Sequence, residues 1–477
     1  MKTKTTNQYF VQQLLNKENE SLKINTLQNN FQELFAWGKI ILLVIILMSA
    51  LSLTHAATKT STAVGGAWSN GSTWVGGNVP ATGDAVIIAT TGTNAVSITN
   101  NLTQTATGSV TVNSGAILNM TTNGVDISLG TLTINGGGTV TVQRDLTVQG
   151  ATSISGTINF GSTNSSQNRT MTFSGDVTLN NGAVWNETTT GAVAVFNFGG
   201  NFTNNATTFT TQNNSAATHT FTGTGKTISG STVSTIPYLV INGTRTNNGT
   251  LGVSASLTGS GTLSNETTGT LNFGGISISP SLTLNAATVG NTVNYNSSTN
   301  QTVKATSYYN LVFSGSGTKS ISSNTTISGN LSISGTAVAS LANSTNSTAN
   351  SLTLGGVNKV SGSWGSTGST ATYKNSTYFG TSPNGIITVA TSPVSATSIA
   401  TSGTPVIYGT SVTFTATVTG TNGTATGTVT FKDGTTTLGA GTLSSGSATF
   451  STGTLSASTH GITAIYSGDD NYGTSTF

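Results

Sequence analysis

The stretch from Thr131 to Phe160 decides the fold class, because apolar and polar residues alternate in it in short runs. A period of two places the apolar side chains on one face of an extended strand. Glycine-rich segments such as Asn135-Gly-Gly-Gly138 and Ser155-Gly156 separate the runs and predict tight turns. The alternating runs are Leu132-Thr-Ile134, Val140-Thr-Val142, Leu146-Thr-Val148 and Ile158-Asn-Phe160.

The same pattern continues from Ala57 to about Ala390, with a strand roughly every 8–12 residues. A sandwich would run out of sheet before that length, so stacked repeats are favoured. Internal similarities support repetition, and we interpret the 75- and 72-residue intervals among them as two or three coils. We therefore predict an all-β chain with a parallel β-helix, or solenoid, over 57–390. The similar segments are the Asn-Phe-Gly tripeptides at Asn159, Asn197 and Asn272, and Tyr238-Leu-Val-Ile241 with Asn310-Leu-Val-Phe313.

The composition agrees with this fold and excludes several classes of protein. Lys and Arg number 15 and Asp and Glu 12, so that 6% of the chain is charged, where an ordinary globular protein has about 25%. This deficit argues against a nucleic-acid-binding protein, which needs clustered cations, and against an ordinary soluble enzyme. Without cysteine, the chain has neither disulfides nor thiolate metal sites. Regular apolar alternation disfavours the remaining alternative, a disordered chain.

An apolar run from Ile40 to Leu53 follows a polar N-terminal segment. Its 14 residues suit the hydrophobic region of a signal peptide better than a membrane span of about 20 residues. Thr54 and Ala56 supply the small side chains that a signal peptidase accepts. We predict that residues 1–56 are a signal peptide with a long n-region, removed on export to leave no membrane span. The alternative is an uncleaved signal anchor.

Tryptophans stand at the start of the predicted solenoid. The segments Gly65-Gly-Ala-Trp68, Thr73-Trp74-Val-Gly-Gly-Asn-Val-Pro80 and Gly83-Asp84-Ala-Val-Ile-Ile88 resemble the start of β-helical surface proteins from Bacteroidetes-type bacteria. The resemblance implies that Trp68 and Trp74 cover the open end of the first coil, an edge that solenoids must protect. The alternative for these tryptophans is a sugar-binding platform.

The end of the predicted solenoid also carries aromatic residues. Ser361-Gly-Ser-Trp364, Tyr373 and Tyr378-Phe379 precede a last apolar strand, Gly385-Ile-Ile-Thr-Val389. This arrangement resembles a closing module in the same surface proteins. The resemblance implies that Trp364 and Phe379 seal the other end of the core.

After a Ser/Thr/Pro-rich linker the pattern changes to longer alternating strands. Gly427-Thr-Val-Thr-Phe-Lys-Asp-Gly434 and Tyr466-Ser-Gly-Asp469 closely resemble the marks of a bacterial immunoglobulin-like (Ig-like) repeat. The resemblance implies a two-sheet β-sandwich over 391–477, with Lys432-Asp433-Gly434 as a hairpin turn. The apolar positions expected for its core are Val412, Phe414, Val418, Val429, Phe431, Phe450, Ile462, Tyr466 and, against the alternation, Ile465.

The last strand of such a repeat normally pairs along the sheet, and here it has barely begun at Gly473-Thr-Ser-Thr-Phe477. We therefore expect an incomplete sandwich, in a chain that is a fragment of a longer protein. An unpaired edge exposes amides and carbonyls, and favours aggregation or pairing with another chain. Extension of the module by the next encoded residues is then expected to raise its thermal midpoint.

Residues that could carry catalysis are scattered. A β-helical polysaccharide lyase or hydrolase needs carboxylates, or a carboxylate and a basic residue, that converge on one groove. Asp145 and Asp176 stand in contexts that match those of Asn201 and Asn330. A turn residue that accepts backbone hydrogen bonds tolerates this exchange, whereas a general base does not. The candidates considered are Asp126, Asp145, Asp176, Glu187, Glu266, Arg144 and Arg169.

The other titratable residues give no stronger signal. Glu187 and Glu266 share the context Asn-Glu-Thr-Thr, which we interpret as a repeated turn. His219 and His460 fall in different predicted domains, so they are not expected to contribute to the same metal site or catalytic triad. Asp469-Asp470 is interpreted as a solvated turn, with calcium binding as the alternative. We therefore assign no catalytic, cofactor-binding or metal-binding residue.

The favoured hypothesis is an exported, non-catalytic protein of the cell surface or the extracellular space. In this hypothesis a solenoid stalk and Ig-like spacers act in adhesion or surface display. The expected partners are surface polysaccharides or host and matrix glycans, and not nucleic acid. One alternative is a β-helical polysaccharide lyase or hydrolase. The other is a carbohydrate-binding module that uses surface aromatics such as Tyr308, Tyr309 and Tyr373.

Overall fold

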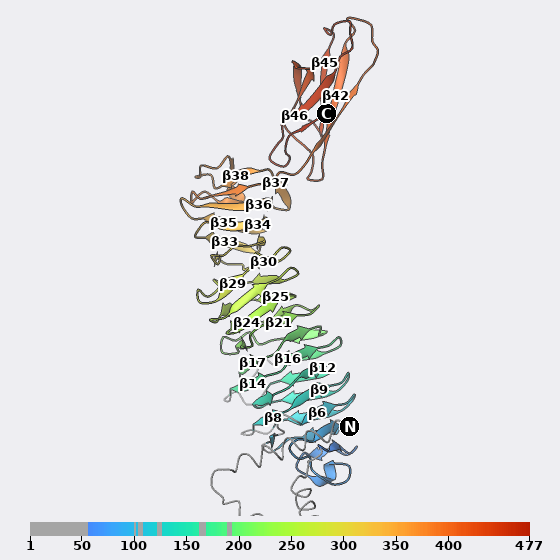
Figure 1. The fold of residues 1–477 in the computed structure, drawn as a ribbon, viewed down its shortest axis with the longest axis vertical. Coiled ribbons are helices and arrows are strands. Elements are labelled where there is room, and N and C mark those ends of the chain that lie inside the picture. Colours follow the sequence, from blue (N-terminus) through green and yellow to red (C-terminus); the bar gives the residue numbers. More distant parts are fainter. Residues whose placement is uncertain (1–55, 100–101, 104–107, 122–125, 162–167, 188–192) are drawn as a thin grey trace, which may run out of the picture. The chain divides into compact units, whose positions relative to one another are not determined.

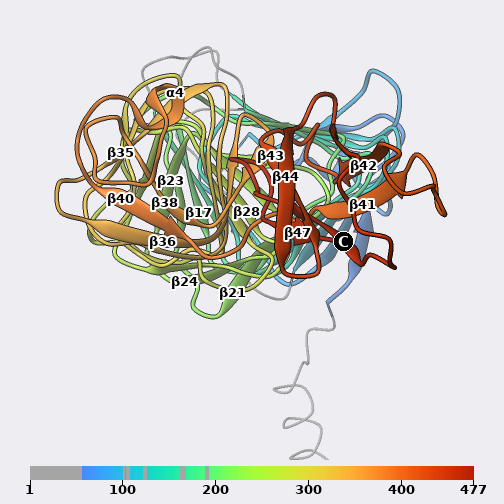
Figure 2. The same cartoon turned by 90° about the horizontal axis from the view of Figure 1, so that it is seen from above.

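The computed structural model describes residues 56–99, 102–103, 108–121, 126–161, 168–187 and 193–477, so the predicted signal peptide at 1–56 lies almost wholly outside them. From Thr58 onward, short strands wind into coils, and each strand pairs in parallel with its counterpart one coil later (Figure 1). Figure 2 looks along the stack, so that the coils overlie one another. The predicted all-β solenoid is confirmed.

Three parallel sheets form the walls of the first coils, and we number the sheets 1 to 7. Sheet 1 contains β1 (Thr58–Thr60), β3 (Ala85–Ile88), β6 (Ser109–Val112), β9 (Thr131–Ile134), β12 (Thr152–Ile154), β15 (Val177–Leu179), β18 (Phe202–Asn204), β21 (Lys226–Ser229), β24 (Thr244–Asn247), β27 (Thr262–Asn265) and β29 (Thr283–Asn285). Sheet 2 contains β2 (Gly66–Ala67), β4 (Val96–Ser97), β7 (Ile117–Met120), β10 (Thr139–Val142), β13 (Thr157–Phe160), β16 (Val184–Glu187) and β19 (Thr208–Thr210). Sheet 3 contains β5 (Leu102–Thr103), β8 (Ile127–Leu129), β11 (Leu146–Val148), β14 (Arg169–Phe173), β17 (Ala194–Phe198), β20 (His219–Phe221), β23 (Tyr238–Ile241) and β26 (Ser256–Thr258).

Two further sheets belong to the later coils. Sheet 4 contains β22 (Ser234–Thr235), β25 (Thr250–Val253), β28 (Thr270–Phe273), β30 (Thr292–Tyr295), β32 (Asn310–Phe313), β34 (Thr326–Ile333), β36 (Asn346–Leu354), β40 (Ile386–Val389), β38 (Gly362–Gly365) and β39 (Tyr373–Lys374), with β37 (Val357–Lys359) paired to β36. Sheet 5 contains β31 (Gln301–Thr302), β33 (Ser316–Ile321) and β35 (Thr336–Leu341). Short helical turns are η1 (Gly71–Thr73) and α4 (Ser376–Phe379).

The period-two pattern explains which side chains form the core. In β9, Leu132 and Ile134 are fully buried while the two threonines of the strand are only half-buried. Leu132 pairs with Val110 of the preceding coil and with Thr152 of the next, so that inward positions stack in columns. Each fully buried Leu or Ile contributes about 1.5–3 kcal/mol. One continuous core therefore runs from Trp68 to Val389.

Glycines allow the coils to approach closely at one corner. A Cβ atom placed on Gly175 would lie 2.4 Å from the carbonyl oxygen of Gly150, and one on Gly200 would lie 2.3 Å from that of Gly175. These distances are shorter than any real Cβ contact, so a larger residue would force the coils apart. Part of the high glycine content therefore serves the stacking of the coils.

The Asn-Phe-Gly tripeptides do not mark one repeated position of the coil, although intervals of 72 and 75 residues fit about three coils. The Asn-Phe-Gly tripeptides at Asn159, Asn197 and Asn272 lie in sheets 2, 3 and 4, not on one face of the solenoid. A coil takes 18 residues from Val140 to Ile158 and 27 from Ile158 to Trp185. Turns of variable length absorb this difference, so similar strands recur without a fixed period.

Aromatic residues close both ends of the solenoid core. Trp68 and Trp74 are 4% and 2% exposed, and their rings meet edge to face at 4.9 Å. At the other end Trp364 and Phe379 are buried on β38 and α4. There β38 pairs with β40 in the antiparallel sense, which ends the parallel winding. The expected positions of the capping residues are confirmed, and burial of Trp68 and Trp74 excludes an exposed sugar platform.

The C-terminal domain is a sandwich of two antiparallel sheets. Buried side chains alternate along its strands as expected, and Phe450 and Ile462 are half-buried against them. Ile465 lies outside this core, because Ala464 and Tyr466 hold the inward positions of their strand. Sheet 6 contains β41 (Ala396–Thr401), β42 (Val412–Thr419) and β45 (Ser447–Thr452). Sheet 7 contains β44 (Thr436–Thr442), β43 (Thr428–Asp433), β46 (Ile462–Tyr466) and β47 (Ser475–Thr476).

Candidate functional site

Four of the candidate charged residues come together at the corner that leads into sheet 3. Asp126 precedes β8, Arg144 and Asp145 precede β11, and Arg169 begins β14, on three successive coils. Adjacent residues of an extended strand point to opposite faces. Accordingly Arg144 and Arg169 are buried, whereas Asp126 is exposed and Asp145 half-buried. The two guanidinium groups are therefore enclosed in the fold, while the two carboxylates keep access to solvent.

The charged residues at this corner affect one another's pKa values and bind neighbouring coils. Burial and the nearby guanidinium of Arg169 lower the pKa of Arg144, and the carboxylate of Asp126 opposes this effect. Asp145 Oδ1 accepts a hydrogen bond of 2.7 Å from the backbone N–H of Thr170 on the next coil. Asp145 thus holds one coil to the next, as a structural residue does.

Asp176 directly precedes β15 of sheet 1 and also binds the next coil. Its Oδ1 accepts from the backbone N–H of Asn201 at 2.8 Å, and its Oδ2 accepts from Asn201 Nδ2 at 3.1 Å. Asn201 Oδ1 in turn accepts from the N–H of Thr227 at 2.9 Å. The two hydrogen bonds from Asn201, backbone and side chain, lower the pKa of Asp176. Asp176 and Asn201 therefore occupy the same position on successive coils, where either residue type is accepted. Asp145 and Asn330 belong to sheets 3 and 4, so the four residues do not share one repeat position.

Replacement of Asp176 by asparagine is expected to change the free energy of unfolding by no more than about 1 kcal/mol, because Oδ1 can still accept from Asn201. Asp145→Asn is expected to behave alike. Asn201→Asp is the matched control, and it should cost more, because it places a second carboxylate beside Asp176. Chemical denaturation of the full chain measures all three variants. Lost glycan binding or activity in Asp176→Asn with an intact fold would contradict the structural role.

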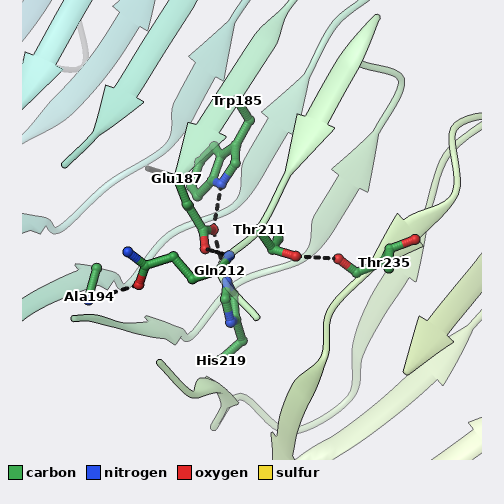
Figure 3. Close-up of polar contacts among 7 residues, drawn as sticks. All are labelled: Trp185, Glu187, Ala194, Thr211, Gln212, His219 and Thr235. Atoms are coloured by element: carbon green, nitrogen blue, oxygen red, sulfur yellow. Dashed lines mark hydrogen bonds and ion pairs between the residues drawn. The ribbon is translucent and has the colours of Figure 1, made fainter. Parts of the chain in front are cut away.

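Glu187 is the centre of a buried polar network (Figure 3). Its Oε1 accepts from Trp185 Nε1 at 2.8 Å and lies 2.9 Å from His219 Nε2. Its Oε2 accepts from the backbone N–H of Gln212 at 2.9 Å. Gln212 Oε1 accepts from the N–H of Ala194 at 3.2 Å. The network therefore joins β16 of sheet 2 and the segment after β19 to the start of β17 and to β20 in sheet 3.

This network corrects the interpretation of Glu187 as a turn residue. Glu187 and His219 are each 1% exposed, and the imidazole stacks on Phe196 at 4.8 Å. A polysaccharide cannot reach groups that are enclosed in this way. Glu266, which shares the local sequence, is half-buried and lies in the turn after β27 as expected. The inward position of Trp185, two residues before Glu187, was the signal that could have placed the carboxylate correctly.

Two buried cations were not foreseen from the sequence. Lys319 is fully buried, and its Nζ donates to the carbonyl oxygens of Ser297 and Thr299 and to Gln301 Oε1 at 2.7–3.2 Å. Burial lowers the pKa of Lys319 to about 8. Arg245 is buried over the Phe221 ring and donates to backbone carbonyls. Both cations bind backbone carbonyl oxygens of neighbouring coils and so hold the coils together.

The aromatic residues proposed for glycan contact are only partly available. Tyr308 is fully buried, with its hydroxyl 3.1 Å from that of Tyr295, so its expected surface position was wrong. Tyr309, the next residue, is half-buried. Tyr373 is half-buried and stacks on Trp364 at 4.7 Å. These rings form no continuous exposed platform among the described residues.

In the C-terminal domain His460 pairs with Asp433. His460 Nδ1 lies 2.6 Å from Asp433 Oδ2, and Nε2 lies 2.9 Å from the carbonyl oxygen of Ser456. Both neighbours are acceptors, so both contacts are hydrogen bonds only when both ring nitrogens carry protons. The Ser456 carbonyl and the Asp433 carboxylate raise the pKa of His460. The pair ties the loop before β46 to the end of β43.

The stability of the C-terminal domain is therefore expected to fall as the pH rises through the folded-state pKa of His460. Because this pKa lies above the ordinary value of 6.5, the contribution is complete below that value and is lost at higher pH. NMR titration of the imidazole in the full chain measures the pKa, and Asp433→Asn is expected to lower it. A wild-type midpoint at or below the ordinary value would contradict the assignment.

Asp469 is a structural residue of the turn after β46. Its Oδ1 accepts from the N–H groups of Asn471 and Tyr472, and its Oδ2 from the N–H and hydroxyl of Thr426. Burial alone would raise the pKa of Asp469, but these hydrogen bonds lower it overall. Its oxygens therefore already have donors. Within the described residues, no group of three or more His, Asp or Glu side chains could hold a metal ion.

Comparison with known proteins identifies one part of the chain. The family model of the bacterial Ig-like domain (group 3) matches residues 397–477, which contain β41 to β47. The C-terminal domain is thus a bacterial Ig-like domain, which accounts for less than a fifth of the chain. Neither the curated proteins nor the solved structures that were compared contain a match to the chain. In the described part of the chain, no helix is long and apolar enough to cross a membrane.

Proposed function

We propose that this chain is an exported, non-catalytic protein of the outer cell surface or the extracellular space. In this proposal the solenoid is a spacer that carries the Ig-like domain, and the whole acts in adhesion or surface display. The observation that carries the proposal is the use of the charged side chains within the fold. Glu187 binds three groups inside the core, and Asp145 and Asp176 bind the next coil. These hydrogen bonds give the carboxylates a structural role, which supports a non-catalytic protein.

The architecture supports a mechanical role. The solenoid core is continuous from Trp68 to Val389, and each coil rests on its neighbours through backbone pairing and stacked apolar columns. Repeat proteins of this kind add length without a new fold. The outward face carries Ser, Thr and Asn rather than Lys or Arg, as in β9 and β13. Such a face suits neutral glycans, and not nucleic acid, as partners.

A panel of polysaccharides tests the proposal, with each member assayed for both binding and cleavage by the full chain. We expect no cleavage, and weak binding to surface or matrix glycans if adhesion is the role. Cleavage that is lost in Asp126→Ala or Asp145→Ala with an intact fold would instead favour a lyase or hydrolase at the corner of sheet 3. Binding without display on cells would favour a carbohydrate-binding module.

The location is tested on intact cells. External protease is expected to remove the solenoid and the Ig-like domain from the cell surface, or the protein is expected in the medium. Mass spectrometry of the exported protein should give an N-terminus at Ala57, after loss of residues 1–56. An N-terminus upstream of Ile40 would contradict removal of the signal peptide. Intact protein in the cytoplasm would contradict export itself.

A further inference from the structure

The hairpin of β36 and β37 has one edge that no strand of the solenoid covers. β37 pairs with β36 in the antiparallel sense on one side only. Successive residues of an antiparallel strand turn their N–H and C=O groups to opposite sides. Asn358, in the middle of β37, turns both groups away from β36 and toward the Ig-like domain. Open main-chain groups at a strand edge favour pairing with another segment.

One side chain of the Ig-like domain binds both of these groups. Asn422, in the loop between β42 and β43, accepts from the N–H of Asn358 at 3.0 Å through its Oδ1. Its Nδ2 donates to the carbonyl oxygen of Asn358 at 2.7 Å and to that of Asn471 at 2.8 Å. A side-chain amide carries an acceptor oxygen beside a group with two donors. Asn422 therefore takes the place of one residue of a neighbouring strand.

Two further bonds join the end of β37 to the turn that follows β46. Lys359 Nζ donates to Asn471 Oδ1 at 2.6 Å, and the N–H of Val360 donates to the carbonyl oxygen of Asp470 at 3.3 Å. Val360 is buried in the solenoid core, where its carbonyl oxygen accepts from Trp364 Nε1. This segment is therefore anchored to the closing tryptophan of the solenoid. We call these two bonds, together with those of the Asn422 side chain, the junction contact.

The core of the Ig-like domain holds the two loops that make the junction contact. Tyr472 is 1% exposed, and its hydroxyl donates to the carbonyl oxygen of Gly423 at 2.7 Å and accepts from the N–H of Asn422. Asp469, in the second loop, accepts from the N–H and hydroxyl of Thr426 in the first. The loops are thus arranged before they meet the solenoid, so that docking orders few additional groups.

The segment that links the two domains is itself bound to the solenoid. The N–H and the hydroxyl of Thr391 donate to the carbonyl oxygen of Asn350 at 2.9 and 2.7 Å. Ser392 Oγ accepts from the N–H of Ser361 at 2.9 Å. These bonds leave little free chain between the last coil and β41. Residues 57–477 accordingly form one compact unit.

We propose that the Ig-like domain is the outer cap of the solenoid and is held on the open edge of β37 by Asn422. The partner in this contact is a strand edge of the same chain, recognised through its main-chain N–H and C=O groups. Cover of an edge strand by a neighbouring element protects it from pairing with other chains. This role goes beyond that of a spacer and does not depend on adhesion or display.

The junction contact is polar, so it can open without unfolding either domain. A cavity of about 580 Å³ lies beside it and is lined largely by polar residues, among them Ser361, Ser392 and Asp470. Water that enters such a cavity can replace the bonds of Asn422 and Lys359 when the domains separate. The Ser/Thr/Pro-rich linker then allows movement that the closed contact prevents.

Hydrogen exchange of the full chain tests the contact itself. Asn422→Ala removes the acceptor and the donors that bind Asn358, while Tyr472 still holds the loop. Exchange at the Asn358 amide is expected to be about tenfold faster or more in this variant, because the amide loses its acceptor. Thr421→Ala is the matched control, since Thr421 is exposed beside Asn422, and it is expected to exchange as the wild type does.

Spin labels report whether the two domains stay docked. The chain contains no cysteine, so Ser323→Cys and Thr435→Cys, at exposed positions of the two domains, give one labelled pair. Pulsed electron resonance is expected to give a narrow distance distribution in the wild type and a wider one in Asn422→Ala. Asn358→Pro should also widen it, because proline removes the N–H at an edge position, where strands accept proline. Asn358→Ala keeps the N–H and should leave the distribution narrow.

Each other outcome decides the question. A wide distribution in the wild type, or an unchanged one in both Asn422→Ala and Asn358→Pro, would overturn the proposal. If Asn422→Ala also loses protection in β43, the Ig-like domain itself is weakened, and Asn358→Pro then decides. Faster exchange in β36 and β40 of the undocked protein, with β9 unchanged, is expected of a cap. Equal protection of β36 and β40 in docked and undocked protein would overturn the capping role.

Discussion

Replacement of Glu187 by leucine is expected to lower the free energy of unfolding of the solenoid by about 3 kcal/mol or more, because three buried groups lose the carboxylate that binds them. The change removes both acceptor oxygens from Trp185 Nε1, His219 Nε2 and the N–H of Gln212. Each buried polar group left without a partner costs about 1–3 kcal/mol. Thermal unfolding of the full chain by circular dichroism measures the effect, and hydrogen exchange locates it at β16 and β20.

The glutamine variant is expected to fall between leucine and the wild type. Glu187→Gln keeps one carbonyl oxygen, but its amide N–H₂ must face either Trp185 Nε1 or the N–H of Gln212, which are both donors. One donor therefore stays unpaired, at about 1–3 kcal/mol. This order of stabilities follows from the hydrogen-bond directions alone, whatever the volume of the side chain.

Glu266→Leu is the matched control for these variants, because Glu266 has the same local sequence but lies half-buried in a turn. We expect it to change the free energy of unfolding by no more than about 0.5 kcal/mol, as for most surface positions. Equal losses in Glu187→Leu and Glu266→Leu would contradict the network. So would a Glu187→Gln variant that is less stable than Glu187→Leu.

The alternation of residues was sufficient to predict the fold class and the composition of the core. In the alternating runs between Thr131 and Phe160, as at Leu132 and Ile134, the structure buries the apolar residues. The same period of two would have corrected the wrong predictions for Glu187 and Tyr308. It would have placed Glu187 inward after Trp185, and it forbids adjacent Tyr308 and Tyr309 from both facing solvent. In both cases a local motif was given more weight than the strand period.

The pairing of distant residues could not be predicted in the same way. Glu187 and His219 are 32 residues apart in the chain, and they meet only because the intervening turns have particular lengths. A coil varies from 18 to 27 residues between Val140, Ile158 and Trp185, and no period in the sequence specifies these lengths. The fold of the Ig-like domain was easier to predict from the sequence, because its hairpin and turn motifs have a fixed place in a known architecture. Even there Ala464, and not Ile465, takes the inward position.

The capping tryptophan gives the second large expected effect. Trp74→Ala is expected to cost about 3–5 kcal/mol, as truncation of a buried tryptophan does, because Trp74 is 2% exposed and packs on Trp68. The variant also loses the hydrogen bond of 2.8 Å from Trp74 Nε1 to the carbonyl oxygen of Trp68. Within the described residues, one neighbouring coil holds the first coil, so the loss should appear there first. Faster hydrogen exchange in β1 to β3, and protease cleavage near them, measure it.

The spread of this loss along the solenoid depends on the coupling between coils. If each coil is held mainly by its own neighbours, β1 to β3 open while β9, β12 and the Ig-like domain keep their protection. Val75→Ala is the control, because Val75 follows Trp74 directly and is 64% exposed, so the first coil should stay closed in that variant. Equal exchange in β1 to β3 of Trp74→Ala and Val75→Ala would mean that the tryptophan does not cap the core. Uniform loss of protection through β29 would mean instead that the coils unfold as one unit, since a local defect can spread that far only if the interfaces are stronger than the coils themselves.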